Sequence, residues 1–361
     1  MTATKKSDKA QAKSGPEPKS GSAKSASAKS SSAKSRSKSE LKSGSRSRTR
    51  TESKSRAKSG AEAVRELRLV KEAKIQDLIG DGAGTRLEAS GVLYRDGAFL
   101  IVCDNLRSLI RVSSELSPKA PENGVFEANV PKKSGSSAAE TAVGYEDLAH
   151  DALHDHYFML SEAEPVKPKG FRARVHEYDA KGRSVGSTHL DFDLADANKG
   201  MEGLEWVERS GTEHLLALCE GNRCEGGKKG RTPGGGRIQV FRRDGKGWAH
   251  TDTIRLPQSL PFEDYSSVSV RDGRIAVLSQ ASSALWVGRI SAKKWEVDEG
   301  TVHRLPTDGK GRTVYGNAEG VSWVSADHVV IVSDRAKKGT GERLRAKDQS
   351  IHLFLIPSDN S

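Results

Sequence analysis

Short apolar runs alternate with polar turns from about residue 64 to the end of the chain, and five of these runs share one ending. Each closes on a carboxylate or amide side chain, and the five read LIVCD, FMLSE, LALCE, AVLSQ and VIVSD. Upstream of each, a small or acidic residue is followed by Gly, Asp or Ser and then by an apolar residue. These phrases begin at residues 90, 146, 202, 266 and 319, a spacing of 53 to 64 residues. A β-rich repeat of this period is typical of propeller blades.

Each repeat divides into four predicted strands, A to D in chain order. In the third repeat these are Leu204–Val207, Leu215–Cys219, Ile238–Arg242 and Trp248–Leu256. Asp-Gly pairs between the segments, as at Asp96-Gly97, are strong hairpin signals. The fifth repeat ends after its C strand (Ile351–Ile356), and the spare apolar segment 64–75 can supply the missing outer strand. Such pairing removes exposed sheet edges, so the sequence predicts an all-β fold, a five-bladed β-propeller closed by an N-terminal strand on the last blade.

Residues 1–60 differ from the rest in composition and charge. They are nearly all Ser, Lys, Ala, Arg and Gly, with 17 Lys and Arg against four Asp and Glu, a net charge of +13. The whole chain carries +11, so residues 61–361 carry about −2. A segment with so few apolar side chains cannot offset its chain entropy by burial. We therefore expect a disordered basic tail at 1–60 and the propeller at 61–361.

Targeting and redox signals are sparse. The N-terminus has no apolar signal-peptide core and no stretch approaches 18 apolar residues, so we expect a cytoplasmic monomer without a transmembrane segment. The three cysteines, Cys103, Cys219 and Cys224, are an odd number and are not expected to form a disulfide framework. Cys103 and Cys219 stand where the other repeats have serine, so we interpret them as small, buried strand-end residues. A redox or metal role is the alternative.

The strand order places two sets of side chains at one mouth of the ring. The first residues of the A strands converge on the central axis, and they are Ser90, Glu146, Glu202, Ser266 and Glu319. The residues that end the B strands lie just outside them, and they are Asp104, Glu162, Glu220, Gln280 and Asp334. Carboxylates at close range repel, so a hard cation is favoured as their partner, and all-oxygen ligands suit Ca²⁺ better than Zn²⁺. The alternative is a channel filled by water and hydrogen bonds.

These phrases resemble the calcium-activated nucleotidase, or soluble apyrase, family. LEASGVLYRDGAFLIVCDN is similar to that family's first blade, DYSSVSV to its fourth and AEGVSWV to its fifth. GMEGLEW and LLALCEGN are also similar to bacterial phytase-like, or esterase-like, propeller domains. The resemblance implies a five-bladed propeller with a central Ca²⁺, ringed by Ser90, Glu146, Glu202, Ser266 and Glu319.

The chain also departs from that family. After the first B strand the family has an acid followed by Arg, and after the third a pair of Arg, whereas this chain has Asp104-Asn105 and Glu220-Gly221. Near the end of the fourth B strand the family has Lys, and this chain has Ser279-Gln280. Basic residues that would hold phosphates are missing at these positions. The calcium ring can therefore be kept while nucleotide hydrolysis is lost or altered.

Other basic residues lie in two loops at the same mouth. Together with Asp104 they are the candidate substrate-binding residues, namely Arg223, Lys228, Lys229, Arg231 and Arg335. Gly-rich backbone, as in the loop 221–236, can approach an anion and offer N–H groups. The alternative is a pair of mobile, solvated loops.

A further polar cluster falls on the A–B turn of the second repeat, away from the mouth. Its members are His150, Asp151, His154, Asp155 and His156. Although such residues can bind metal, we interpret the cluster as a turn rich in polar side chains.

Two functions remain open. The first is a Ca²⁺-dependent hydrolase of phosphate esters or anhydrides, with a phosphorylated small molecule as substrate and Glu162, Glu220 or Asp334 as the candidate base. The second is a non-catalytic propeller that serves as a binding or scaffold module, with a structural cation. In either case the tail 1–60 has the charge to attach to nucleic acid or another polyanion, and a solubilising extension is its alternative.

Overall fold

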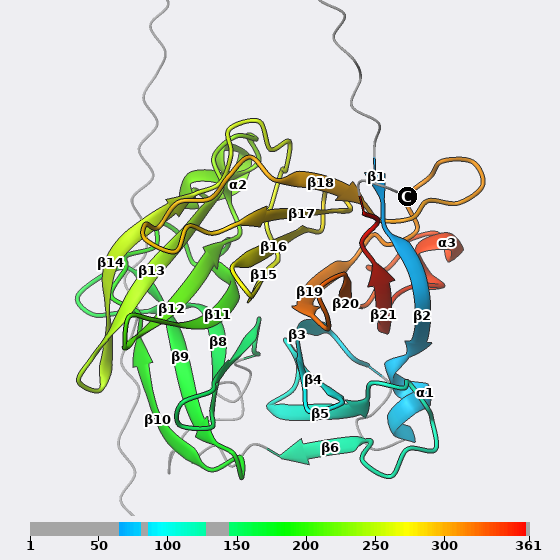
Figure 1. Ribbon diagram of the computed structural model, residues 1–361, viewed down its shortest axis with the longest axis horizontal. Helices are drawn as coiled ribbons and strands as arrows, with labels where there is room; N and C mark the ends of the chain where they lie inside the picture. Colours follow the sequence, from blue (N-terminus) through cyan, green and yellow to red (C-terminus); the bar gives the residue numbers. More distant parts are fainter. Residues whose placement is uncertain (1–64, 81–85, 128–143, 359–361) are drawn as a thin grey trace, which may run out of the picture. The chain divides into compact units, whose positions relative to one another are not determined.

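The computed structural model describes residues 65–80, 86–127 and 144–358. The predicted basic tail at 1–60 lies outside these residues. The described residues form five sheets arranged as the blades of a propeller, and Figure 1 shows the sheets around a common centre. The fold class predicted from the repeat is therefore confirmed. No helix among the described residues is long and apolar enough to cross a membrane.

In each blade, strands that follow one another in the chain pair antiparallel, and blades 4 and 5 each gain one further strand from the N-terminal segment. Blade 1 contains β3 (Ala89–Arg95), β4 (Ala98–Cys103), β5 (Ser108–Ser113) and β6 (Gly124–Glu127). Blade 2 contains β7 (Leu148–Asp151), β8 (His156–Pro165), β9 (Phe171–Asp179) and β10 (Ser184–His189). Blade 3 contains β11 (Met201–Arg209), β12 (Thr212–Cys219), β13 (Arg237–Asp244) and β14 (Gly247–Arg255). Blade 4 contains β15 (Ser267–Arg271), β16 (Arg274–Ser279), β17 (Ala284–Arg289) and β18 (Thr301–Arg304). Blade 5 contains β19 (Ala318–Trp323), β20 (His328–Ser333) and β21 (Ser350–Leu355).

The N-terminal strands close the ring. Strand β2 (Arg68–Lys74) pairs antiparallel with β21 and is the outer strand of blade 5, which confirms the closure predicted for the segment 64–75. Strand β1 (Arg65–Glu66) adds, in parallel, to β18 at the outer edge of blade 4. This second pairing was not predicted, because a two-residue strand has no periodicity. Together β1 and β2 tie the last two blades to the start of the described chain.

Short helical segments and strand ends are where the sequence prediction is wrong in detail. The inner strand of blade 3, β11, runs from Met201 to Arg209 and so extends beyond the predicted Leu204–Val207 at both ends. Four helical segments were not predicted: α1 (Ile75–Ile79), the 3₁₀ turn η3 (Asn222–Cys224), α2 (Gly227–Gly230) and α3 (Glu342–Arg345). Each has five residues or fewer, which is too short for a helical hydrophobic period to appear.

The apolar runs seen in the sequence are the best buried parts of the fold. All six residues of β4 are buried, and so are the last six of β12. These second strands have blade neighbours on both sides, so both of their faces pack against apolar side chains and the run is continuous rather than alternating. The Asp96-Gly97 hairpin that precedes β4 has φ angles of 48° and 73°, the left-handed pair that a type I′ turn requires.

Side chains of the inner strands join neighbouring blades. Asp147 Oδ2 accepts hydrogen bonds from the N–H of Leu204 (3.0 Å) and from Ser267 Oγ (2.9 Å). Ser267 Oγ in turn accepts the N–H of Val321 (3.1 Å), so three bonds connect blades 2 to 5. Ser322 Oγ accepts the N–H of Tyr94 (3.1 Å) and connects blade 5 to blade 1. These side chains hold the inner strands in register around the axis.

Such close approach leaves no room for a side chain at Gly91. A Cβ atom there would lie 2.6 Å from Asp147 Oδ1 and 2.7 Å from Asp147 Cα. We predict that Gly91→Ala lowers the free energy of unfolding by about 1–3 kcal/mol, because a buried clash forces backbone shifts. Gly186→Ala in β10 is the matched control, since nothing lies within 4 Å of that position. Urea unfolding measures both variants, and equal stability would contradict the tight packing.

Candidate metal centre

Irregularities in strand pairing turn the axial residues toward the centre. In blade 1, Ala89 pairs with Cys103 and Gly91 with Val102, which leaves Ser90 as the extra residue of a β-bulge. The same shift leaves Glu202 between Met201 and Gly203, and Glu319 between Ala318 and Gly320. Glu146 and Ser266 lie just ahead of β7 and β15. A bulge redirects its unpaired residue, so the backbone itself presents these side chains to the axis.

The axial residues and the strand-end residues line one central cavity of about 230 Å³. The cavity brings together all ten side chains that the repeat placed at one mouth. They are Ser90, Asp104, Glu146, Glu162, Glu202, Glu220, Ser266, Gln280, Glu319 and Asp334. Glu88, Asp264, Tyr265 and Lys337 complete the lining. Carboxylate oxygens of Glu162, Glu202 and Glu220 all lie within 4.8 Å of one another, so these three acids could hold a metal ion.

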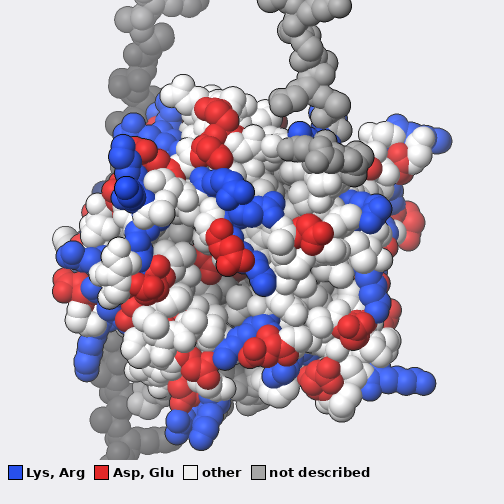
Figure 2. Space-filling model, viewed as in Figure 1, with Lys and Arg blue, Asp and Glu red and all other residues white. Residues whose placement is uncertain are grey.

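Negative charge in this cavity greatly exceeds positive charge. Nine of the lining residues are Asp or Glu, and the only basic one is Lys337. Lys199 approaches from outside the lining and pairs with Glu220 at 2.5 Å. By contrast, acidic and basic side chains are interspersed over the face of the molecule seen in Figure 2. The negative charges in the cavity are therefore not balanced by neighbouring positive charges, as those on this face of the molecule are.

Protein groups satisfy only part of the acidic set. Gln280 Nε2 donates to Glu319, and the N–H of Gly200 donates to Glu162 at 2.8 Å. Across the described residues, Glu146 and Glu202 have neither a hydrogen-bond donor nor an ion-pair partner for their carboxylates. Both residues are half-buried, so their carboxylates lose part of their hydration with no donor to replace it, which is costly.

Burial and mutual repulsion raise the pKa values of these acids. Burial is the larger cause for Glu146, whose pKa rises to about 8, with Asp104 and Glu162 adding repulsion. The pKa of Glu202 and that of Glu319 are raised well above the usual value, again by burial first and by neighbouring carboxylates second. Burial also raises the pKa of Asp334 to about 6. A bound cation would reverse these shifts, because it favours the ionised form.

Two acids in the lining were missed from the sequence. Glu88 and Asp264 lie two residues ahead of the axial serines, Ser90 and Ser266. At the same offset from the three axial glutamates the chain has Gly144, Gly200 and Asn317. An alignment of the five repeats would have found both acids, because they occupy the same position in the two repeats whose axial residue is Ser. Asp264 also has a structural role, since it accepts Ser279 Oγ (2.7 Å) and the N–H of Ala281.

The structure corrects the sequence prediction for the cysteines. Cys219 and Cys224 form a disulfide with 5.2 Å between their Cα atoms, whereas Cys103 is a buried free thiol as expected. An odd number of cysteines excludes complete pairing but leaves room for one local bridge. The η3 turn folds Cys224 back to the end of β12, and Glu220 lies within the small loop that the disulfide closes.

The basic residues predicted to bind the substrate fall into two groups. Arg223 and Lys229 line a second cavity of about 290 Å³ together with Glu225 and Thr232. Lys228, Arg231 and Arg335 are exposed and belong to the lining of neither cavity. Asp104, the acidic member of the predicted substrate-binding set, lines the central cavity.

The polar turn of blade 2 is charge-balanced. Asp151 Oδ2 lies 2.7 Å from His154 Nδ1, and Glu213 of blade 3 lies 3.8 Å from the same nitrogen, so this group could also hold a metal. However, Arg243 Nε lies 3.7 Å from Glu213, and Asp151 Oδ1 accepts the N–H groups of Leu153 and His154. Hydrogen bonding to Asp151 raises the pKa of His154, which favours an imidazolium over a metal-binding ring. These contacts support the interpretation as a polar turn.

Comparisons with known proteins give no family. No family model matches the chain, and no curated protein matches it. Among solved structures the chain is similar to glutaminyl cyclase of Myxococcus xanthus, with 12% identity over 81% of this chain and 98% of that one, and a TM-score of 0.45. It is also similar to xylan β-1,4-xylosidase of Bacillus halodurans C-125, with 8% identity, coverages of 75% and 53%, and a TM-score of 0.46. A luciferin-regenerating enzyme matches with 11% identity, coverages of 76% and 80%, and a TM-score of 0.42. These are distant similarities to other proteins and assign neither a family nor an activity.

We predict that the metal-free protein loses stability as the pH rises from 4.5 to about 8, the range between the ordinary pKa of Glu146 and its pKa in the fold. The sign follows because a raised pKa means that the folded state binds more protons than the unfolded state in this range. Glu202→Gln should flatten the slope, since it removes one repelling carboxylate. Glu263→Gln, an exposed acid close in sequence to the lining residue Asp264, is the control. Urea unfolding in EDTA at several pH values checks this, and an unchanged slope in Glu202→Gln would contradict it.

Proposed function

We propose that the protein binds Ca²⁺ in the central cavity, and that this cation is the centre of its function. The observation that carries the proposal is the pair of enclosed carboxylates, Glu146 and Glu202, which have no partner in the described part of the chain. A cation would offset both their lost hydration and their mutual repulsion.

The donor set fits a hard cation. The lining offers mainly oxygen ligands, and its only nitrogen-bearing side chains are those of Gln280 and Lys337. It has neither His nor Cys. Ca²⁺ takes six to eight oxygen ligands, whereas Zn²⁺ prefers nitrogen and sulfur. The residues proposed to hold the ion are the axial ring, Ser90, Glu146, Glu202, Ser266 and Glu319, and the carboxylates of Glu162 and Glu220 lie close enough to Glu202 to share it.

We predict opposite effects of Glu146→Gln with and without calcium. In EDTA the variant should melt at a higher temperature than the wild type, because one repelling carboxylate is gone. With Ca²⁺ about 100-fold above its dissociation constant, the wild type should gain roughly 2.7 kcal/mol and the variant much less. Thermal unfolding at fixed protein concentration measures both effects.

The control for this experiment is Glu263→Gln, which should gain as much from Ca²⁺ as the wild type does. If Ca²⁺ and EDTA give the same melting temperature for the wild-type protein, the cation proposal fails. If Mg²⁺ or Mn²⁺ stabilises in place of Ca²⁺, the cavity binds a hard cation of a different size.

A second candidate function is Ca²⁺-dependent hydrolysis of phosphate esters or anhydrides. The observation that favours it is the position of Asp334, which lies with a pKa of about 6 in a cavity whose lining also includes the basic Lys337. A carboxylate with this pKa can accept a proton near neutral pH. A bound Ca²⁺ would polarise a phosphoryl oxygen and acidify a water. The similarity of the repeated phrases to calcium-activated nucleotidases and phytase-like propellers also supports this candidate.

The remaining acids would have separate roles in such a reaction. Glu220 is held by Lys199, and Glu162 accepts the N–H of Gly200, so both carboxylates are oriented by protein donors. Glu162, Glu220 and Asp334 are the candidate bases, and Asp104 lies in the same lining. Arg335, which follows Asp334 in the chain, is the first candidate for contact with the substrate, whereas Arg223 lines the neighbouring cavity.

We predict that a panel of nucleotides, pyrophosphate and phosphate monoesters contains at least one compound that releases phosphate only when Ca²⁺ is present. Asp334→Asn should then lower kcat by about 10²–10⁴-fold, the usual contribution of a general base. A phosphate-release assay on the full-length protein measures this, with Glu263→Gln as the control. If no compound in the panel is hydrolysed, the non-catalytic propeller, a binding module with a structural cation, is the better description.

A further inference from the structure

Strands β13 and β14 of blade 3 bring two arginines directly opposite one another. Arg237 pairs with Arg255 in the antiparallel register, at the end of the hairpin remote from the turn at Asp244–Gly247. Cross-strand neighbours of like charge destabilise a sheet. Their side chains also lie near Arg223, and the pKa of Arg237 is lowered by burial first and by repulsion from Arg255 and Arg223 second.

These three arginines have few partners. Arg237 donates to the carbonyl of Gly236 at 2.8 Å, and no carboxylate among the described residues forms an ion pair with any of the three. Nearby, Arg223 and Lys229 line the cavity of about 290 Å³ with Thr232 and Glu225. The lining of that cavity has two cations and one carboxylate, Glu225, and Arg237 and Arg255 add further positive charge beside Arg223.

The loop that carries Arg223 is firmly anchored. On one side is the Cys219–Cys224 disulfide. On the other is the buried Asn222, whose side chain donates to the carbonyls of Gly230 and Phe262 (both 3.1 Å). Asn222 Oδ1 also accepts the N–H of Gly235 (2.9 Å) and the hydroxyl of Tyr265 (2.8 Å). The backbone that carries Arg223 is therefore held in place before any ligand arrives, which lowers the entropy cost of ordering the loop on binding.

We propose that Arg223, Lys229 and Arg237 of blade 3 form a binding site for a phosphate group, with Arg255 adding charge and Thr232 a hydroxyl donor. Guanidinium groups present paired N–H donors that match the oxygens of phosphate, and charge-assisted bonds of this kind are strong. The cavity volume suits a small phosphate compound, whose charge removes the repulsion between Arg237 and Arg255.

This site lies outside the central cavity and does not require the cation. Its occupant is a phosphate group of a small molecule, either inorganic phosphate or a phosphomonoester. The cavity is open to solvent, with Arg223, Lys229 and Thr232 exposed, so a nucleic acid could reach the same cations and is an outcome that the experiment must separate.

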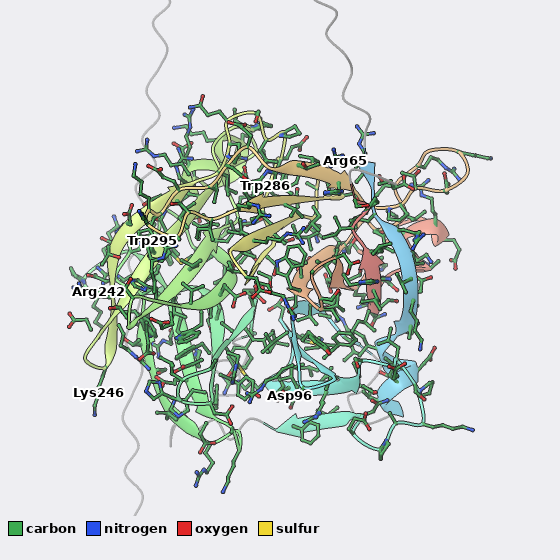
Figure 3. The ribbon with its side chains drawn as sticks, viewed as in Figure 1. Arg65, Asp96, Arg242, Lys246, Trp286 and Trp295 are labelled. Carbon is green, nitrogen blue, oxygen red and sulfur yellow. A yellow bond between two sulfur atoms is a disulfide. The ribbon has the colours of Figure 1, made fainter. Side chains whose placement is uncertain are left out.

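The test is calorimetric titration of the full-length protein in EDTA, without reducing agent and at low salt. Inorganic phosphate, glycerol 2-phosphate and a short DNA duplex are the three probes. Arg223→Gln and Arg237→Gln should each weaken binding of the phosphate compounds by at least about tenfold, through loss of charge-assisted bonds. Arg242→Gln is the matched control, because Arg242 is an exposed arginine on the same strand, toward the hairpin turn near Lys246 (Figure 3).

Thermal unfolding of the variant shows whether a loss of binding is caused by misfolding. Without phosphate, Arg237→Gln should melt at the same temperature as the wild type or higher, since it removes the repulsion with Arg255. With phosphate, the wild type should gain more in melting temperature than the variant does. Use of EDTA keeps this outcome independent of the calcium proposal, so either proposal can fail alone.

Three results would overturn the site. One is binding of both phosphate compounds weaker than about 1 mM. Another is equal weakening by Arg242→Gln, which would show general charge attraction. The third is loss of duplex binding in Arg223→Gln and Arg237→Gln with no binding of the small compounds, which would identify a polyanion surface.

Discussion

Repulsion among the carboxylates around the propeller axis is the interaction on which the rest of this structure depends. Burying one unpaired carboxylate is costly, and Glu146, Glu202 and Glu319 share a cavity with six more acids. Protonation relieves part of the strain, as the raised pKa values of Glu146 and Asp334 show. A cation relieves it more completely, because it also replaces lost hydration with ligand bonds. The fold holds the acids together against this repulsion, and carboxylates gathered in this way could hold a positive ion.

The layer of strands beneath the cavity provides the opposing force. Asp147, Ser267 and Ser322 bond across the blades to backbone N–H groups, and glycines such as Gly91 and Gly320 allow the strands to approach closely. These bonds lie one or a few residues along the same strands from the axial ring. The ring cannot expand to separate its charges unless this network breaks. Bulges at Ser90, Glu202 and Glu319 then direct the side chains inward, so backbone geometry and the packing below it determine the position of each ligand.

The repeat in the sequence was enough to predict the five blades, their closure and the ten residues that meet at the mouth. This succeeded because strand direction alone decides which ends share a face, and no side-chain detail is needed. The Cys219–Cys224 bridge escaped prediction because it depends on the η3 turn, a local feature with no periodicity. The Arg237–Arg255 pair escaped because cross-strand register cannot be read to one residue from the sequence. Glu88 and Asp264 were within reach, since their offset from the axial serines was present in the repeat.

Glu220 and Arg223 of blade 3 are close in sequence but do not pair with each other, and Glu220 pairs instead with Lys199. Glu220 lines the central cavity, and Arg223, three residues later, lines the neighbouring one. A freely moving loop would allow such side chains to pair and would stabilise the protein. Here the disulfide and the five side-chain hydrogen bonds of Asn222 hold the loop, so that acid and base line separate cavities. A protein that keeps unpaired acids and unpaired arginines apart gives up stability at both places. That loss is understandable if each group is completed by an ion from solution, a cation on the axis and a phosphate beside it.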